Sequence, residues 1–156
     1  MGLSSFNKQG PNFVPAYQVS GVPFVTSSAP QELSSATAAV NVRFPYVTRW
    51  FEITNTGSGT LRFGFSRNGV LGSGAASGSN IPETEKTANH NNYYVISGSS
   101  GNSPSTVRLE LRCKELFLSS FSGEAPTGFS IVAGLTGVEK NQFPNLTGSN
   151  GFWGVG

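Results

Sequence analysis

Aspartate is absent from this chain of 156 residues, and its eight acidic residues are all glutamate. The absence excludes the aspartic-protease pair, catalytic triads that contain Asp, and EF-hand calcium loops. One histidine and one cysteine are too few for a His/Cys zinc site, which takes three or four protein ligands. The composition therefore predicts a protein that is not an enzyme and that binds neither a metal nor another cofactor.

Charge is also scarce, since 12% of the residues are charged and the net charge is +2. The ten basic residues are scattered, whereas nucleic-acid binding requires a basic stripe. No stretch approaches the roughly 18 consecutive apolar residues of a membrane span. We therefore expect no nucleic acid among the partners and no membrane-spanning segment.

The single cysteine, Cys113, has no partner for an internal disulfide. Residues 1–6 lack the basic and apolar regions of a secretory signal. Both features predict a chain that is made and folded in a reducing cytoplasm.

Apolar residues recur at every second position through most of the chain, which is the pattern of β-strands. The clearest case is 107–114, where the face that contains Leu111 and Cys113 is apolar and the other face is charged. Three consecutive apolar residues follow at 116–118. We therefore expect a bend near Lys114, at which one long segment leaves one sheet and joins another.

The other expected strands are short and lie within 40–48, 49–54, 61–65, 93–96 and 129–135. Pro45 interrupts the first of them, so it is expected at a sheet edge or at a corner between sheets. Helix is nearly absent: 31–39 fits either two helical turns or a loop, and 67–92 is expected to be one long loop.

Eight or so short strands with turn-rich connections predict an all-β sandwich or barrel. One cysteine excludes the Cys…Trp…Cys pattern of immunoglobulin domains. The expected fold is a single jelly-roll β-sandwich of two four-stranded antiparallel sheets with extended N- and C-terminal segments. We place an extended arm at 1–39, the sandwich at 40–138 and a C-terminal tail at 139–156.

Both ends carry scattered apolar residues among prolines or glycines. Two interpretations stay open: these residues lie across neighbouring subunits, or they cover sheet edges of their own sandwich. Candidate subunit contacts, each of which could instead belong to the core, are Phe13, Tyr17, Phe24, Trp50, Phe152 and Trp153.

Few other residues suggest chemistry. Cys113 falls on an apolar strand face, where a thiol is a small core group, and His90 lies in a polar loop. Glu110 lies between two arginines, as in a solvated charge ladder. Trp50 is out of phase with its buried neighbours, and one of the adjacent Tyr93 and Tyr94 should face outward. Such aromatics either form a platform for sugar rings or contact neighbouring chains.

Four segments together resemble a known family. They are 12–26 (NFVPAYQVSGVPFVT), 44–49 (FPYVTR), 109–118 (LELRCKELFL) and 143–148 (FPNLTG). They are similar to the single jelly-roll capsid proteins of large icosahedral double-stranded DNA viruses, the algal and giant-virus group. The resemblance runs over most of the chain. It lies in the general residue pattern of these segments and includes no motif as specific as a zinc signature.

This resemblance implies a structural subunit of the virion, made in the host cytoplasm. The subunit would be a penton protein, five copies of which close a vertex, or a minor capsid protein. Its partners would be copies of itself and other capsid proteins. The chain length leaves no room for a sizeable receptor-binding insertion.

Two other functional classes stay open. A carbohydrate- or receptor-binding β-sandwich, such as a fibre head or lectin, would use the exposed aromatics to bind glycan. A hydrolase would need a pair of glutamates, or Cys113 and His90, close together and accessible to solvent.

Overall fold

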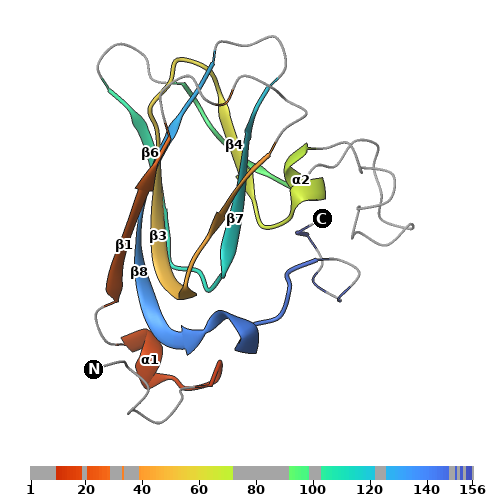
Figure 1. Ribbon diagram of the computed structural model, residues 1–156. Coiled ribbons are helices and arrows are strands. Elements are labelled where there is room, and N and C mark those ends of the chain that lie inside the picture. The colour runs from red at the N-terminus through yellow and green to blue at the C-terminus, as the bar shows by residue number, and fades with distance from the viewer. Residues whose placement is uncertain are drawn as a thin grey trace.

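Two four-stranded antiparallel sheets face each other in the computed structural model (Figure 1). The structure describes residues 10–18, 21–28, 33, 39–71, 92–98, 103–121, 126–147, 150, 152 and 154–155. The first sheet has the order β1 (Val22–Ser27), β8 (Phe129–Glu139), β3 (Tyr46–Asn55) and β6 (Ser105–Leu109). The second has the order β2 (Val40–Arg43), β7 (Glu115–Ser120), β4 (Leu61–Gly64) and β5 (Tyr94–Ile96). The expected all-β sandwich of two four-stranded sheets is confirmed.

The strands pair from the outside of the sequence inward. Strand β1 pairs with β8, β2 with β7, β3 with β6, and β4 with β5, always antiparallel. A single long hairpin that is rolled into two sheets would have these pairings. These pairings establish the sandwich of two antiparallel sheets, and the finer expectation of a jelly roll stays a prediction.

The core between the sheets is built from the alternating apolar positions of the strands. On β3, Phe51 and Ile53 point inward, and on β8 Ile131 and Ala133 do so. Phe51 meets Phe63 of the opposite sheet edge to face, with ring centroids 6.3 Å apart. Burial of these side chains is the main source of stability for the sandwich.

Two expected changes of sheet are confirmed. Pro45 lies between β2 and β3, which belong to different sheets, and residues 110–114 carry the chain from β6 to β7. Leu111 was expected on the buried face together with Cys113, and that expectation is wrong because Leu111 is 42% exposed. Strand β6 ends at Leu109, so the alternation does not continue through the turn.

Asn55, at the end of β3, is a fully buried polar residue that holds one end of the sandwich. Its Nδ2 group donates to the carbonyls of Gly59, Ile96 and Ser97 at 2.9, 3.2 and 3.1 Å. Its Oδ1 accepts from the Gly57 amide at 3.0 Å and from the Thr127 hydroxyl. One amide group therefore joins β3 to the turn that follows it and to the end of β5.

Thr48, near the start of β3, does the same at the other end. Its hydroxyl donates to the Leu111 carbonyl at 2.7 Å and accepts from the Cys113 amide at 2.9 Å. The Thr48 amide in turn donates to the Cys113 carbonyl at 2.9 Å. These bonds fix the crossover from β6 to β7 against the central strand.

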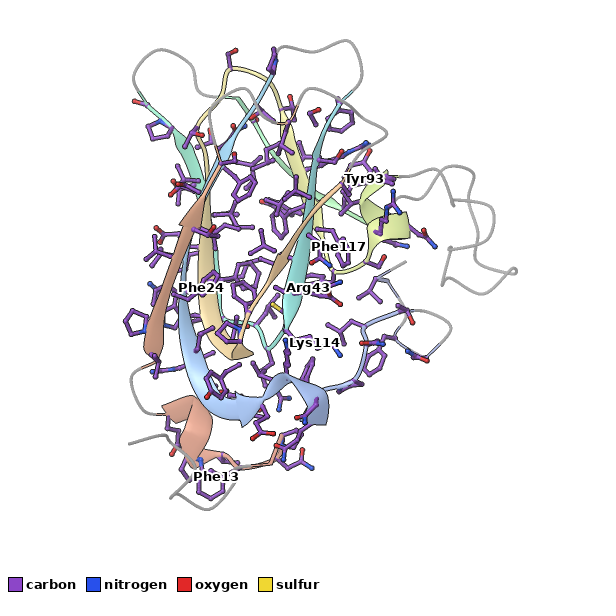
Figure 2. The ribbon with its side chains drawn as sticks, in the orientation of Figure 1. Phe13, Phe24, Arg43, Tyr93, Lys114 and Phe117 are labelled. Atoms are coloured by element: carbon purple, nitrogen blue, oxygen red, sulfur yellow. The ribbon has the colours of Figure 1, made fainter. Side chains whose placement is uncertain are left out.

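The boundary expected at residue 40 is corrected, because β1 lies inside the segment that was assigned to an N-terminal arm. Phe24 points from β1 into the space between the sheets (Figure 2). Its ring packs against that of Phe44, with ring centroids 5.0 Å apart. Pro23 is compatible with this strand because β1 is at the edge of its sheet. The sandwich therefore begins at Val22.

Helical segments in the described residues are short: α1 (Pro15–Gln18), α2 (Arg67–Leu71) and the 3₁₀ turn η2 (Lys140–Gln142). Helix α2 occupies the start of the expected long loop, of which 72–91 lies outside the described residues. Of 31–39, only Leu33 and Ala39 are described. Within the described part of the chain, no helix has the length and hydropathy to cross a membrane.

Replacing Asn55 with Ala should lower the free energy of unfolding by about 3 kcal/mol, because one backbone amide, three carbonyls and a hydroxyl lose this hydrogen-bond partner together. Urea denaturation measures the change. Asn41→Ala is the matched control, since Asn41 makes one side-chain bond, to Glu115 at 2.9 Å on the edge strand β2, and should cost about 1 kcal/mol. Equal losses in the two variants would contradict this role for Asn55.

Candidate functional site

Trp50 points outward from the first sheet, as its phase predicted. It is paired with Gly134, whose missing side chain leaves room for the indole ring. The guanidinium of Arg108 stacks over the ring at 4.0 Å and is held by Glu110 at 3.0 Å. Arg108 therefore covers the ring face that a sugar would need, so Trp50 does not form an open platform.

Tyr17 anchors the N-terminal segment to its own body. Its ring packs on Val47 and Val138, which form a small second core, and against Arg112 at 5.0 Å. Both the Tyr17 hydroxyl and the Arg112 guanidinium donate to the carbonyl of Pro11, at 2.8 and 3.2 Å. The interpretation that the arm covers its own sandwich therefore holds for Tyr17.

Phe13 and Val14, which precede α1, are 46% and 60% exposed. In Figure 2 Phe13 lies at the end of the molecule, away from the space between the sheets. Phe24, in contrast, packs against the core and does not present its ring to a partner. Phe13 is therefore the candidate contact residue that the structure leaves most accessible in this arm.

The described part of the tail also lies along its own body. Leu146 packs against the core, and the Lys114 ammonium donates to the Phe143 carbonyl at 3.1 Å. Near the end, the Ser66 hydroxyl donates to the carbonyl of Val155 beside α2. Phe152 is half-buried, and Trp153 lies outside the described residues.

Tyr94 is the exposed member of the tyrosine pair, at 56%. It is paired with Phe63 and so lies on the inner side of its sheet, but β5 is an edge strand and leaves the ring open to solvent. Tyr93 points to the other side of the sheet. There its ring centroid lies 5.7 Å from that of Phe121 and 5.3 Å from the guanidinium carbon of Arg62. The side chains that pack on each ring, and not phase alone, decide which ring is accessible.

Tyr94 borders a cavity of about 290 Å³ at the side of the sandwich where β5 and β6 form the two sheet edges. Its lining comes from β4, β5, β6 and nearby segments: Phe63, Gly64, Phe65, Asn92, Tyr93, Tyr94, Leu109 and Gly154. The lining is aromatic and uncharged, with an amide and phenol groups as its polar side chains. It suits a neutral ligand with an apolar face.

Cys113 does not offer a nucleophile. The thiol is buried, and this burial raises its pKa from 9.0 to about 12, with a further increase from Glu115 and a partial offset from its hydrogen bond with Thr48. His90 lies outside the described residues. Among the residues that the structure describes, no group of three or more His, Cys, Asp or Glu is placed to hold a metal ion.

Glu110 is exposed beside Arg108 on the outer side of the first sheet, as the charge alternation predicted.

The residues that sequence reasoning missed are Phe65 and Leu109 in the cavity. Their apolar character was visible, but their position at an open edge follows from strand pairing over long range.

No family model matches this chain, and no curated protein matches it. One solved structure is described as "Bacillus endospore appendages form a novel family of disulfide-linked pili". It is similar over 74% of this chain and 91% of its own, with 11% identity and a TM-score of 0.33. A TM-score this low carries no argument about fold or function.

The Cys113 pKa predicts how stability changes at high pH. In the unfolded chain the thiol ionises above its ordinary pKa of 9.0, whereas in the folded protein it stays protonated up to about 12. The unfolded state is therefore favoured as the pH rises through this range, by up to about 1.4 kcal/mol per pH unit. Wild type should lose stability faster than Cys113→Ala between these pH values in urea denaturation. Parallel curves, or rapid labelling of the folded thiol, would contradict the buried state.

Proposed function

We propose that this chain is a non-enzymatic structural subunit of an icosahedral viral capsid. It acts in the virion, as the penton protein or a minor capsid protein, by self-association and by contacts with neighbouring capsid proteins. The observation that carries the proposal is the strand order of the two facing four-stranded sheets, in which the first strand pairs with the last inside one sheet. Jelly rolls are the architecture of many viral capsid domains, and the sequence resembles that group.

The distribution of exposed apolar residues supports contacts between subunits. Five of the seven large hydrophobic residues that are exposed in the described chain come from α1, β1 and the 110–114 crossover, with the segments beside them. They are Phe13, Val14, Val22, Val25 and Leu111. Exposed apolar residues that gather in a few segments are typical of interaction surfaces.

A mass-spectrometric inventory of purified virus particles tests this proposal. We expect the chain to stay with intact particles through salt washing and surface proteolysis, in a constant ratio to the other shell proteins. Immunogold labelling should then place it at the vertices for a penton protein or on the facets for a minor capsid protein. Its presence in infected-cell extracts but absence from washed particles would overturn the proposal.

A carbohydrate-binding module is the second candidate, and the aromatic cavity beside Tyr94 favours it. Pyranose rings stack their apolar face on aromatic side chains, and the cavity is lined by Phe63, Phe65 and Tyr94 together with Asn92. Jelly rolls also occur among lectins. In this role the binding residue would be Tyr94 and not Trp50, whose ring is covered by Arg108.

Glycan-array binding tests the second candidate. Wild type should bind a neutral glycan, Tyr94→Ala should weaken that binding by at least about tenfold because a stacking ring is lost, and Trp50→Ala should leave it unchanged. Thermal unfolding of each variant shows whether the fold is retained. No binding by wild type, or equal loss in both variants, would exclude this cavity as a glycan site.

A further inference from the structure

Strand β1 is an edge strand whose outer side pairs with no other strand among the described residues. It lies at the margin of the sandwich in Figure 1. Proteins usually protect such edges with charged residues or short strands. Edge strand β2 carries Arg43, β6 carries Arg108, and β5 has three residues. Strand β1 is the longest of the four edges, at six residues, and has no charged residue.

The direction of each amide in β1 follows from one hydrogen bond. The Ser28 amide donates to the Phe129 carbonyl at 2.9 Å, and the register places these residues opposite each other. In an antiparallel pair successive residues alternate between the two sides of the strand. Even-numbered residues of β1 therefore point their amides toward β8, and Pro23, Val25 and Ser27 point theirs toward the open side.

The open side has donors at Val25 and Ser27 but none at Pro23, because proline has no amide proton. A second β1 can meet it antiparallel with the two Val25 residues opposite each other. The Val25 residues then exchange both hydrogen bonds, and each Ser27 amide donates to the Pro23 carbonyl of the other copy. Every outward donor has an acceptor, and the missing donor of Pro23 leaves no amide unpaired.

Side chains also fit this register. Val25 lies on the outer face of the sheet, beside Val132, and is 71% exposed in the single chain. Opposite residues of an antiparallel pair lie on the same face, so the two Val25 side chains would cover each other. Among registers that pair both outward donors within the strand, this one also has the longest overlap.

We propose that β1 is a dimerisation strand, which pairs antiparallel with β1 of a second copy and joins their four-stranded sheets into one continuous sheet. The partner is another copy of this chain because the edge is complementary to itself. The contact has two-fold symmetry, so it cannot close a ring of five and would be additional to any vertex contact. The inference is independent of the capsid proposal.

Cross-linking of Val25→Cys tests the contact directly. The native Cys113 is buried, so a short bifunctional maleimide reacts at position 25. We expect a covalent dimer that becomes the main product as the concentration rises, with mass spectrometry identifying the 25–25 linkage. Val95→Cys is the control, because Val95 is also exposed but lies on β5, an edge strand of the other sheet, and it should give only traces of dimer. Equal yields in both variants, or no dimer in Val25→Cys, would overturn the proposal.

Two further variants test the hydrogen bonds and the apolar contact in sedimentation equilibrium. Val25→Pro removes only an amide that points away from β8, and Val25→Lys places like charges opposite each other. Each should raise the dimer dissociation constant by at least about tenfold, with thermal unfolding as the check of folding. Dimers of wild-type affinity in both folded variants would contradict the pairing. The virion inventory is unaffected by either result, so failure here and failure of the capsid proposal are distinguishable.

Discussion

Hydrogen bonding of backbone groups is the constraint on which this sandwich depends. Where the chain passes from one sheet to the other, its amides and carbonyls leave the ladders and must find other partners. Asn55 and Thr48, at the two ends of β3, supply them from buried side chains. Along the outer side of β1 the amides of Val25 and Ser27 face away from the sheet, and no other strand in the described part of the chain pairs with them. One rule thus explains both what closes the fold and where it can be extended.

The sequence predicted the core well because each inner strand has one buried face. Phe51 and Ile53 point inward as their alternation indicated, and Pro45 marks a corner between sheets. The assignment of β1 failed because Pro23 and the nearby prolines resemble an irregular arm. An edge strand tolerates proline on its open side, and nothing local distinguishes such a strand from a loop. Leu111 failed because alternation does not reveal where a strand ends.

The candidate site was less predictable, since local phase gives the face of a side chain but not what covers it. Trp50 faces outward as predicted, yet Arg108 from a neighbouring strand stacks on its ring. Tyr94 faces inward and is nevertheless exposed, because β5 forms the sheet edge. The cavity next to it combines β4, β5 and β6, which are brought together only by long-range pairing. Anchoring of Tyr17 by Arg112 and Pro11 depends on such pairing too.

Residue-resolved amide hydrogen exchange, measured by NMR in dilute and in concentrated protein, tests most directly whether a second copy completes β1. The amides of Phe24 and Thr26 point toward β8 and should be protected at every concentration. Those of Val25 and Ser27 should exchange fast in dilute protein and slow down as the concentration rises. Fast exchange of Val25 and Ser27 at all concentrations, with the even-numbered amides protected throughout, would show that the open side of β1 stays unpaired and would contradict the account.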